Sequence, residues 1–151
     1  DLMIPLPITH NEGSLDFMSV DKYSMIFRVL FGSTYLSERY SETALQLLSL
    51  AKYTTGIVAG VPLDLTVAHK YGIKAVPVAS AITPNYLHDC GIVYYPNHPY
   101  LLCIMTKGKN LVTQQESIKD ISTAAYKWLD VFYRAIPSSS VATTTPSTVI
   151  P

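Results

Sequence analysis

The chain has 151 residues, 11 basic and 11 acidic side chains, and a hydrophobic fraction of 48%. This length and composition fit a globular domain with its own core and exclude an intrinsically disordered protein. The formal net charge of zero gives no electrostatic reason to expect nucleic acid or an anionic membrane as a partner. No apolar run reaches the length of a membrane span.

A first helix is expected to begin at Val20. Residues 1–18 contain prolines, an asparagine and a glycine, which favour a loop. Ser19 can cap the helix, and Gly32 can end it. The apolar residues then recur at helical spacing and form one buried face: Tyr23, Ile26, Phe27 and Leu30.

A second helix is expected to begin after Ser37 or Ser41 and to end before residues 54–56. Its buried face is predicted to consist of four apolar residues: Ala44, Leu45, Leu47 and Leu48.

Three strands are expected next, at 65–73, 87–95 and 100–107. The first shows period-2 alternation and carries Lys70 near its end. A proline-containing connection, 73–86, separates it from the second. Residues 96–99 (PNHP) predict a hairpin turn between the second and third strands.

The last element is predicted to be a helix over 114–135. Thr113 and Glu116 have the spacing of a capping box at its start. Residues 137–151 are rich in Ser, Thr and Pro, which is typical of a disordered tail. The helix is expected to pack on the sheet through one apolar face: Ile118, Ile121, Ala125, Trp128, Leu129 and Phe132.

Several polar residues have structural interpretations. Asp89 is expected to have a structural role, in which it either pairs with a neighbour or accepts hydrogen bonds at the start of its strand. Cys90 and Cys103 fit neither a zinc pattern nor a disulfide framework, so we expect two buried free thiols. We predict no metal site, because the histidines do not have the spacing of metal ligands; they are His69, His88 and His98. We also predict no cofactor.

Residues 65–72 (LTVAHKYG), 89–93 (DCGIV) and 99–106 (PYLLCIMT) follow one another in an order that resembles the C-terminal half of the penicillin-recognising serine hydrolases. These are the class A β-lactamases and their D,D-peptidase-like relatives. The resemblance runs from about residue 19 to about residue 136. It implies an α+β, β-lactamase/transpeptidase-like domain over 1–136, in which an antiparallel sheet carries the C-terminal helix. The helices within 20–52 would be a partial helical subdomain.

The resemblance implies a site around Lys70, which matches the lysine of the family's Lys-Thr-Gly motif. Its charge would serve catalysis and bind the substrate carboxylate. Gly72 would allow close approach, and the Ile73 amide would be an oxyanion donor. Tyr71 departs from the usual threonine or serine, and a phenol cannot place its hydroxyl where a short side chain would. Considered alone, Lys70 has a simpler interpretation as the exposed lysine of an edge strand.

Two further family motifs, a Ser-x-x-Lys nucleophile and a Ser-Asp-Asn loop, have no counterpart at a fitting position. Ser49 and Lys52 have the first spacing, but they fall at a helix end just before the lysine strand. Ser19 and Lys22 are rejected for the same reason. Glu12 lies in the region where class A enzymes carry a deacylating glutamate, but without the surrounding pattern. We therefore expect a C-terminal portion that requires the missing N-terminal part of its domain as a partner.

Three functions remain open. The parent is a serine hydrolase acting on a β-lactam or a peptidoglycan D-alanyl-D-alanine peptide, with the isolated chain inactive. Alternatively, the chain is a non-catalytic module that binds cell-wall peptide or a protein partner, or it is a structural domain of a surface protein. The resemblance implies an extracytoplasmic location, either secreted or on the cell surface.

Overall fold

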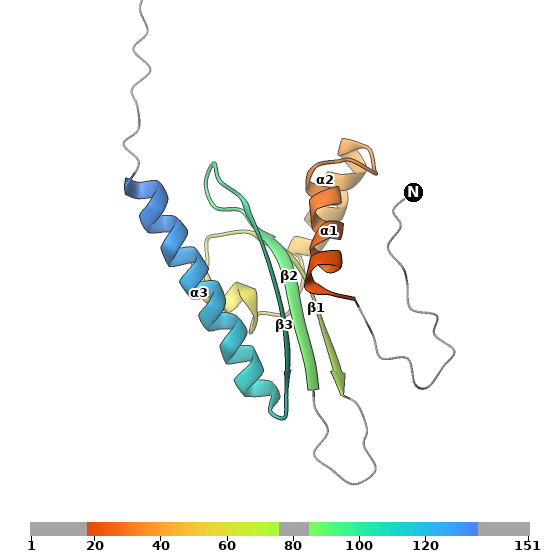
Figure 1. The fold of residues 1–151 in the computed structure, drawn as a ribbon. Coiled ribbons are helices and arrows are strands. Elements are labelled where there is room, and N and C mark those ends of the chain that lie inside the picture. The colour runs from red at the N-terminus through yellow and green to blue at the C-terminus, as the bar shows by residue number, and fades with distance from the viewer. Residues whose placement is uncertain (1–17, 76–84, 136–151) are drawn as a thin grey trace, which may run out of the picture.

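The structure is a computed structural model that describes residues 18–75 and 85–135. A three-stranded sheet lies between helices on both faces (Figure 1). The predictions for residues 1–17, including Glu12, for most of the connection after the first strand and for the tail lie outside the described residues. The elements in chain order are α1 (Val20–Phe31), α2 (Glu38–Ser49), η1 (Ile57–Gly60), β1 (Val67–Ala75), β2 (Asn85–Val93), β3 (Tyr100–Gly108) and α3 (Leu111–Ala135).

The sheet is antiparallel and has the strand order β1-β2-β3. This confirms the predicted order of consecutive antiparallel strands. The hairpin turn between β2 and β3 is also confirmed, and Asn97 adopts a φ of 61° there. The strand bounds differ by one or two residues, since β1 begins at Val67 and β2 ends at Val93.

Local signals at the first helix are confirmed. The Ser19 hydroxyl accepts a hydrogen bond from the Lys22 amide at 3.2 Å, and Gly32 is the C-cap. Tyr23 and Phe27 are buried against the sheet. In α2, Leu45 is buried, but Leu47 is 65% exposed and was wrongly predicted as core. The sheet contacts only one side of this short helix, so Leu47 lies at the border of the buried face.

Helix α3 begins earlier than its predicted capping box. The Asn110 side chain accepts hydrogen bonds from the amides of Val112 at 2.9 Å and Thr113 at 3.3 Å. Because asparagine is as good a cap as serine or threonine, it starts the helix at Leu111. Thr113 is therefore inside the helix, and the predicted capping box is wrong.

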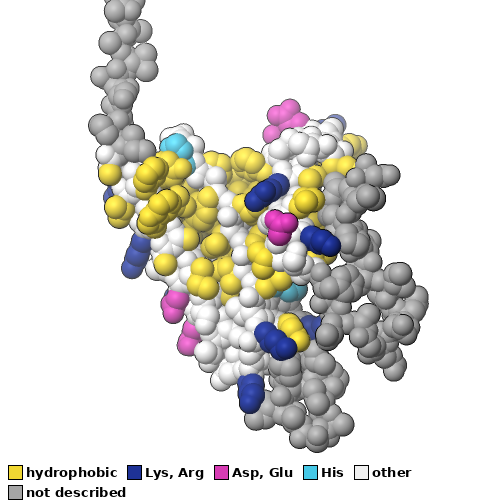
Figure 2. Space-filling model, in the orientation of Figure 1, with side chains coloured by type: hydrophobic (Ala, Val, Ile, Leu, Met, Phe, Trp, Pro, Cys, Tyr) yellow, Lys and Arg dark blue, Asp and Glu magenta, His cyan; other side chains and the backbone are white. Residues whose placement is uncertain are grey.

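The buried face of α3 also differs from the prediction. Trp128 is 66% exposed and Phe132 is 48% exposed, and their rings stack on each other at 5.5 Å. Figure 2 shows hydrophobic side chains at the surface where the C-terminal end of α3 lies. η1 and the sheet approach α3 closely along one face, and this determines which residues of the helix are buried. Small and polar residues are therefore buried there as well as apolar ones. The buried members of this face are Gln114, Ile118 and Ser122.

The expected free thiols are also wrong, since Cys90 and Cys103 form a disulfide. The two residues are partners in the β2–β3 register. Cys90 also pairs with Lys70 of β1 in the β1–β2 register. The Tyr94 amide donates a hydrogen bond to the Thr66 carbonyl, so the β1–β2 pairs formed by even-numbered residues are the hydrogen-bonded ones. Cys90 and Cys103 therefore form a non-hydrogen-bonded pair, in which cross-strand side chains lie closest.

No helix in the described part of the chain is long and apolar enough to cross a membrane.

Gly60→Ala is predicted to destabilise the fold, because a Cβ there would lie 2.5 Å from the Lys119 carbonyl oxygen and from the Ser122 Cβ. The free energy of unfolding should fall by about 1–3 kcal/mol, as for other overpacked sites. Gly108→Ala is the matched control, since its Cβ would meet Gln114 no closer than 3.4 Å. Urea denaturation measures both, and equal midpoints would contradict this packing of η1 on α3.

Candidate functional site

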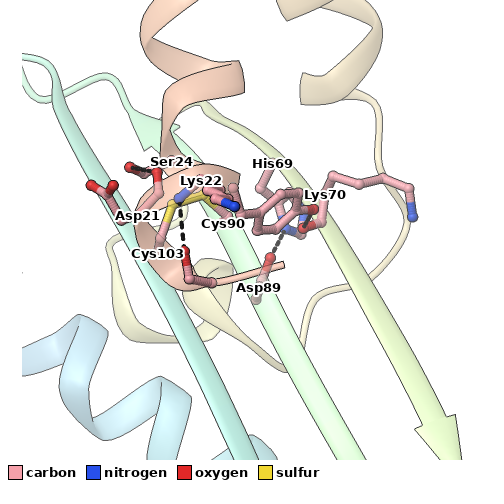
Figure 3. Close-up of a disulfide and its surroundings, with 10 residues drawn as sticks. Asp21, Lys22, Ser24, His69, Lys70, Asp89, Cys90 and Cys103 are labelled. Atoms are coloured by element: carbon pink, nitrogen blue, oxygen red, sulfur yellow. Dashed lines mark hydrogen bonds and ion pairs between the residues drawn. A yellow bond between two sulfur atoms is a disulfide. The ribbon is translucent and has the colours of Figure 1, made fainter. Parts of the chain in front are cut away.

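Lys70 lies on β1, the edge strand of the described sheet, and its side chain is exposed. The Lys70 carbonyl accepts a hydrogen bond from the Tyr23 hydroxyl of α1 at 2.9 Å. Its ammonium donates to the Tyr71 carbonyl at 2.6 Å and lies 5.1 Å from the centre of the Tyr71 ring. Figure 3 shows the Lys70 side chain leading away from His69, Asp89 and the disulfide.

The backbone of β1 also presents an amide at this edge. Even-numbered residues from Thr66 onward form the hydrogen-bonded pairs with β2, as the bond from the Tyr94 amide to the Thr66 carbonyl shows. Antiparallel pairs alternate, so the N–H and C=O groups of Tyr71 and Ile73 point away from β2. The Lys70 ammonium, bonded to the Tyr71 carbonyl, therefore lies on the same open edge as the Ile73 amide.

Gly72 lies opposite His88 in the β1–β2 register. A Cβ at Gly72 would overlap the His88 imidazole, so this strand position requires glycine in the present structure. The His88 ring also meets the Tyr23 ring edge-on at 5.2 Å. The sequence predicted close approach at Gly72 but did not identify His88 as the neighbour. The two residues are equally distant from the middle of the connection between their strands, and this symmetry was the signal available in the sequence.

Tyr71 lies on the opposite face of β1, and its ring stacks on Tyr53 at 3.9 Å and 12°. Tyr53 is half-buried and packs against the core beside η1. The Tyr71 phenol ring therefore belongs to an aromatic stack. Tyr53 was missed by the sequence analysis because it lies in a loop without a motif.

A groove of about 480 Å³ runs along the α1 and α2 side of β1 and reaches Lys70. Its walls are almost entirely apolar, so Lys70 is the charged residue at its margin. The other lining residues are Tyr23, Ile26, Phe27, Leu30, Ala44, Leu47 and Leu48.

Asp89 is fully buried beneath the site and holds three elements together. Its carboxylate accepts a hydrogen bond from the Ile57 amide at 2.9 Å. It also contacts the His69 Nδ1 at 2.8 Å (Figure 3). These contacts link η1, β1 and β2, as expected of a residue that accepts hydrogen bonds.

The surroundings change the proton affinity of two groups beside Lys70. Burial lowers the pKa of His88, and the charge of Lys70 lowers it further, while Asp89 acts in the opposite direction. Burial raises the pKa of Tyr23 to about 12, and the Asp89 charge adds to the effect. The Tyr23 hydroxyl thus stays protonated and remains a donor to the Lys70 carbonyl.

The serines of the two rejected motifs are engaged locally. The Ser49 hydroxyl donates to the Gln46 carbonyl at 2.7 Å, while Lys52 is exposed. The Ser19 hydroxyl caps α1. In residues 18–75 and 85–135, no group of three or more His, Cys, Asp or Glu side chains could hold a metal ion.

The sequence matches the Beta-lactamase2 family, described as "Beta-lactamase enzyme family", over residues 3–129. The chain therefore belongs to this family, which places it among the penicillin-recognising serine hydrolases. A search of curated proteins found no match.

Solved structures share the fold at low identity. PBP-A is 20% identical, with a TM-score of 0.60, over 73% of this chain and 39% of that protein. A class A beta-lactamase from Bacteroides cellulosilyticus is 16% identical, with a TM-score of 0.63, over 74% and 41%. The TLA-1 extended spectrum beta-lactamase is 18% identical, with a TM-score of 0.62, over 72% and 40%. The alignment thus spans about two fifths of each relative's length. A variant of PBP-A was also solved as an acyl-enzyme complex with penicillin G.

The His88 imidazole is predicted to titrate below the usual value of 6.5, and Lys70→Ala should raise its pKa without restoring that value, because burial remains. An unfolded chain binds this proton near pH 6.5, so the stability that neutral His88 contributes should be lost as the pH falls below that value. NMR titration of the His88 ring proton measures the shift. Lys107→Ala is the control, and an equal rise in both variants would contradict the influence of Lys70.

Proposed function

We propose that this chain forms part of a serine hydrolase that transfers the acyl group of a β-lactam or of a D-alanyl-D-alanine peptide. The observation that carries the proposal is the shared edge of β1, where the Lys70 ammonium lies and toward which the Ile73 amide points. A cation and an amide donor on one side of a strand can both face a single reacting group.

The reaction assigns distinct tasks to these groups. A serine oxygen bonds to the substrate carbonyl carbon, the amide C–N bond breaks, and the proton of the serine passes to the leaving nitrogen. The Ile73 N–H would stabilise the negative charge that develops on the carbonyl oxygen. The Lys70 charge would bind the substrate carboxylate and favour proton loss from the serine. The serine itself would come from the part of the fold that this chain does not span.

Further observations support the substrate class, the extracytoplasmic location and the additional part of the domain that this function requires. A variant of PBP-A, which shares the fold, was solved as an acyl-enzyme complex with penicillin G, so a β-lactam is a reasonable probe. The Cys90–Cys103 disulfide is typical of oxidising compartments, which supports an extracytoplasmic site of action on cell-wall peptide. The relatives are about two and a half times as long as the aligned region, which supports a need for the rest of the domain.

A non-catalytic module that binds cell-wall peptide or a protein partner is the second candidate. One observation favours it: Tyr71, whose ring stacks on Tyr53, stands where the resemblance implies a threonine or serine.

Lys70→Ala in the complete protein is predicted to slow acylation by roughly a hundredfold, since one electrostatic donor is worth on the order of 3 kcal/mol of barrier. The fold should persist because the Lys70 side chain is exposed. Acylation by a chromogenic β-lactam and melting temperature measure the two effects. Lys107→Ala, on β3, should have little effect, and similar small changes in both variants would favour the binding module.

The chain of residues 1–151 alone is predicted not to be labelled covalently by a fluorescent penicillin. Its serines lack a lysine partner at the fitting position, and the Ser49 hydroxyl is bonded to the Gln46 carbonyl. Gel fluorescence followed by peptide mapping tests this. A label on Ser49 would show that its Ser-x-x-Lys spacing was wrongly rejected.

A further inference from the structure

We propose that Tyr53 and Tyr71 form an aromatic platform that positions the Lys70 ammonium at the open edge of β1. In this assignment Tyr71 and Tyr53 are positioning residues that act through the lysine. The inference deepens the proposed function, on which its consequence for acylation rests, while the position of the ammonium can be measured without any reaction.

The lysine and the platform meet through two contacts. Neighbouring residues of a strand direct their side chains to opposite faces, so an extended Lys70 would diverge from Tyr71. Instead the Lys70 side chain turns across the open edge, where its ammonium lies 5.1 Å from the Tyr71 ring centre and 2.6 Å from the Tyr71 carbonyl oxygen. A cation within about 6 Å of an aromatic face is attracted by its quadrupole.

The second ring holds the first in place. Tyr53 stacks on Tyr71 at 3.9 Å with an interplanar angle of 12°, and it is itself packed against the core around η1. The Tyr53 ring also lies 6.4 Å from the His69 ring, whose Nδ1 contacts the buried Asp89. The platform is thus connected to buried groups of the core through Tyr53.

The charge of Lys70 remains available for a ligand. Among the described residues, no carboxylate forms an ion pair with it, and its ammonium keeps hydrogen-bonding capacity beyond the bond to the Tyr71 carbonyl. A ring face, unlike a carboxylate, orients the ammonium without neutralising it. Tyr71 therefore lacks the short hydroxyl side chain of the family pattern, but its ring supplies a surface that orients the ammonium.

The contribution should depend on the rings and not on the phenol oxygens. The Tyr53 hydroxyl is buried without a hydrogen-bond partner in the structure, so Tyr53→Phe removes no bond that the fold uses. Tyr53→Phe and Tyr71→Phe both preserve the stack and are the matched controls. Tyr53→Leu and Tyr71→Leu keep apolar volume but remove a ring.

The test uses the complete protein labelled with 13C at the lysine ε-carbon, and the spectrum of Lys70→Ala identifies the Lys70 resonance. The ring face should shift the Lys70 ε-proton signal upfield in the wild type and in both Phe variants. Tyr71→Leu should abolish this shift, and Tyr53→Leu should reduce it. Melting temperatures are recorded to confirm that each variant is folded. The platform would be overturned if the Lys70 signal kept its upfield shift in Tyr71→Leu, or if that shift were lost in Tyr71→Phe.

The same variants are then acylated with a chromogenic β-lactam. A cation–π contact at an exposed site is worth about 0.5–1 kcal/mol, so each Leu variant should be acylated roughly two- to fivefold more slowly, with both Phe variants unchanged. If the wild type is not acylated at all, the proposed function fails, while the resonance shifts still decide whether the platform exists. If acylation proceeds but the Leu variants match the wild type, the platform does not serve the reaction.

Discussion

The buried carboxylate of Asp89 is the constraint on which the described fold depends. An isolated charge in an apolar interior is costly, and it is tolerated only where hydrogen bonds compensate it. Asp89 obtains these from the Ile57 amide and from His69. The two contacts fix η1 against β1 and β2 at one point, and η1 in turn packs against α3, where the Ser122 hydroxyl donates to the Ile57 carbonyl at 2.8 Å. Ile57 thus links the sheet to α3 through both of its backbone polar groups.

This arrangement explains why an exposed site can have a defined geometry. Lys70 follows His69 directly in β1, so the strand that carries the cation is anchored by the buried His69–Asp89 contact one residue away. On the other face the Tyr23 hydroxyl binds the Lys70 carbonyl, which joins the strand to α1. Beside the ammonium, the edge-facing backbone groups of Tyr71 and Ile73 have no partner strand among the described residues. Rigid elements that surround an open edge are the arrangement expected of a preorganised binding site.

Features with local causes could be predicted from the sequence. Ser19 and Gly32 bound α1 through their own chemistry, and Asn97 makes its turn because asparagine tolerates a positive φ. The strand order and the position of Lys70 followed from the residue patterns together with the family resemblance. The Cys90–Cys103 bond was within reach of the same reasoning, because the two residues are equally distant from the centre of the hairpin. Treating them as separate buried residues concealed that relation.

Features that depend on contacts between distant elements could not be predicted. Helical periodicity places Trp128 and Ile118 in one apolar set, but only the close approach of Gly60 to Ser122 decides which part of α3 is buried. The imidazole of His88 above Gly72 depends likewise on the β1–β2 register. The stack of Tyr53 on Tyr71 brings together a loop and a strand. Tyr71, the residue that the resemblance marks as a departure from the family's Lys-Thr-Gly motif, therefore acquires a physical meaning only when its partner from the loop is known. A substitution that removes a hydroxyl from a recognition motif need not abolish recognition where an aromatic neighbour can order the remaining cation.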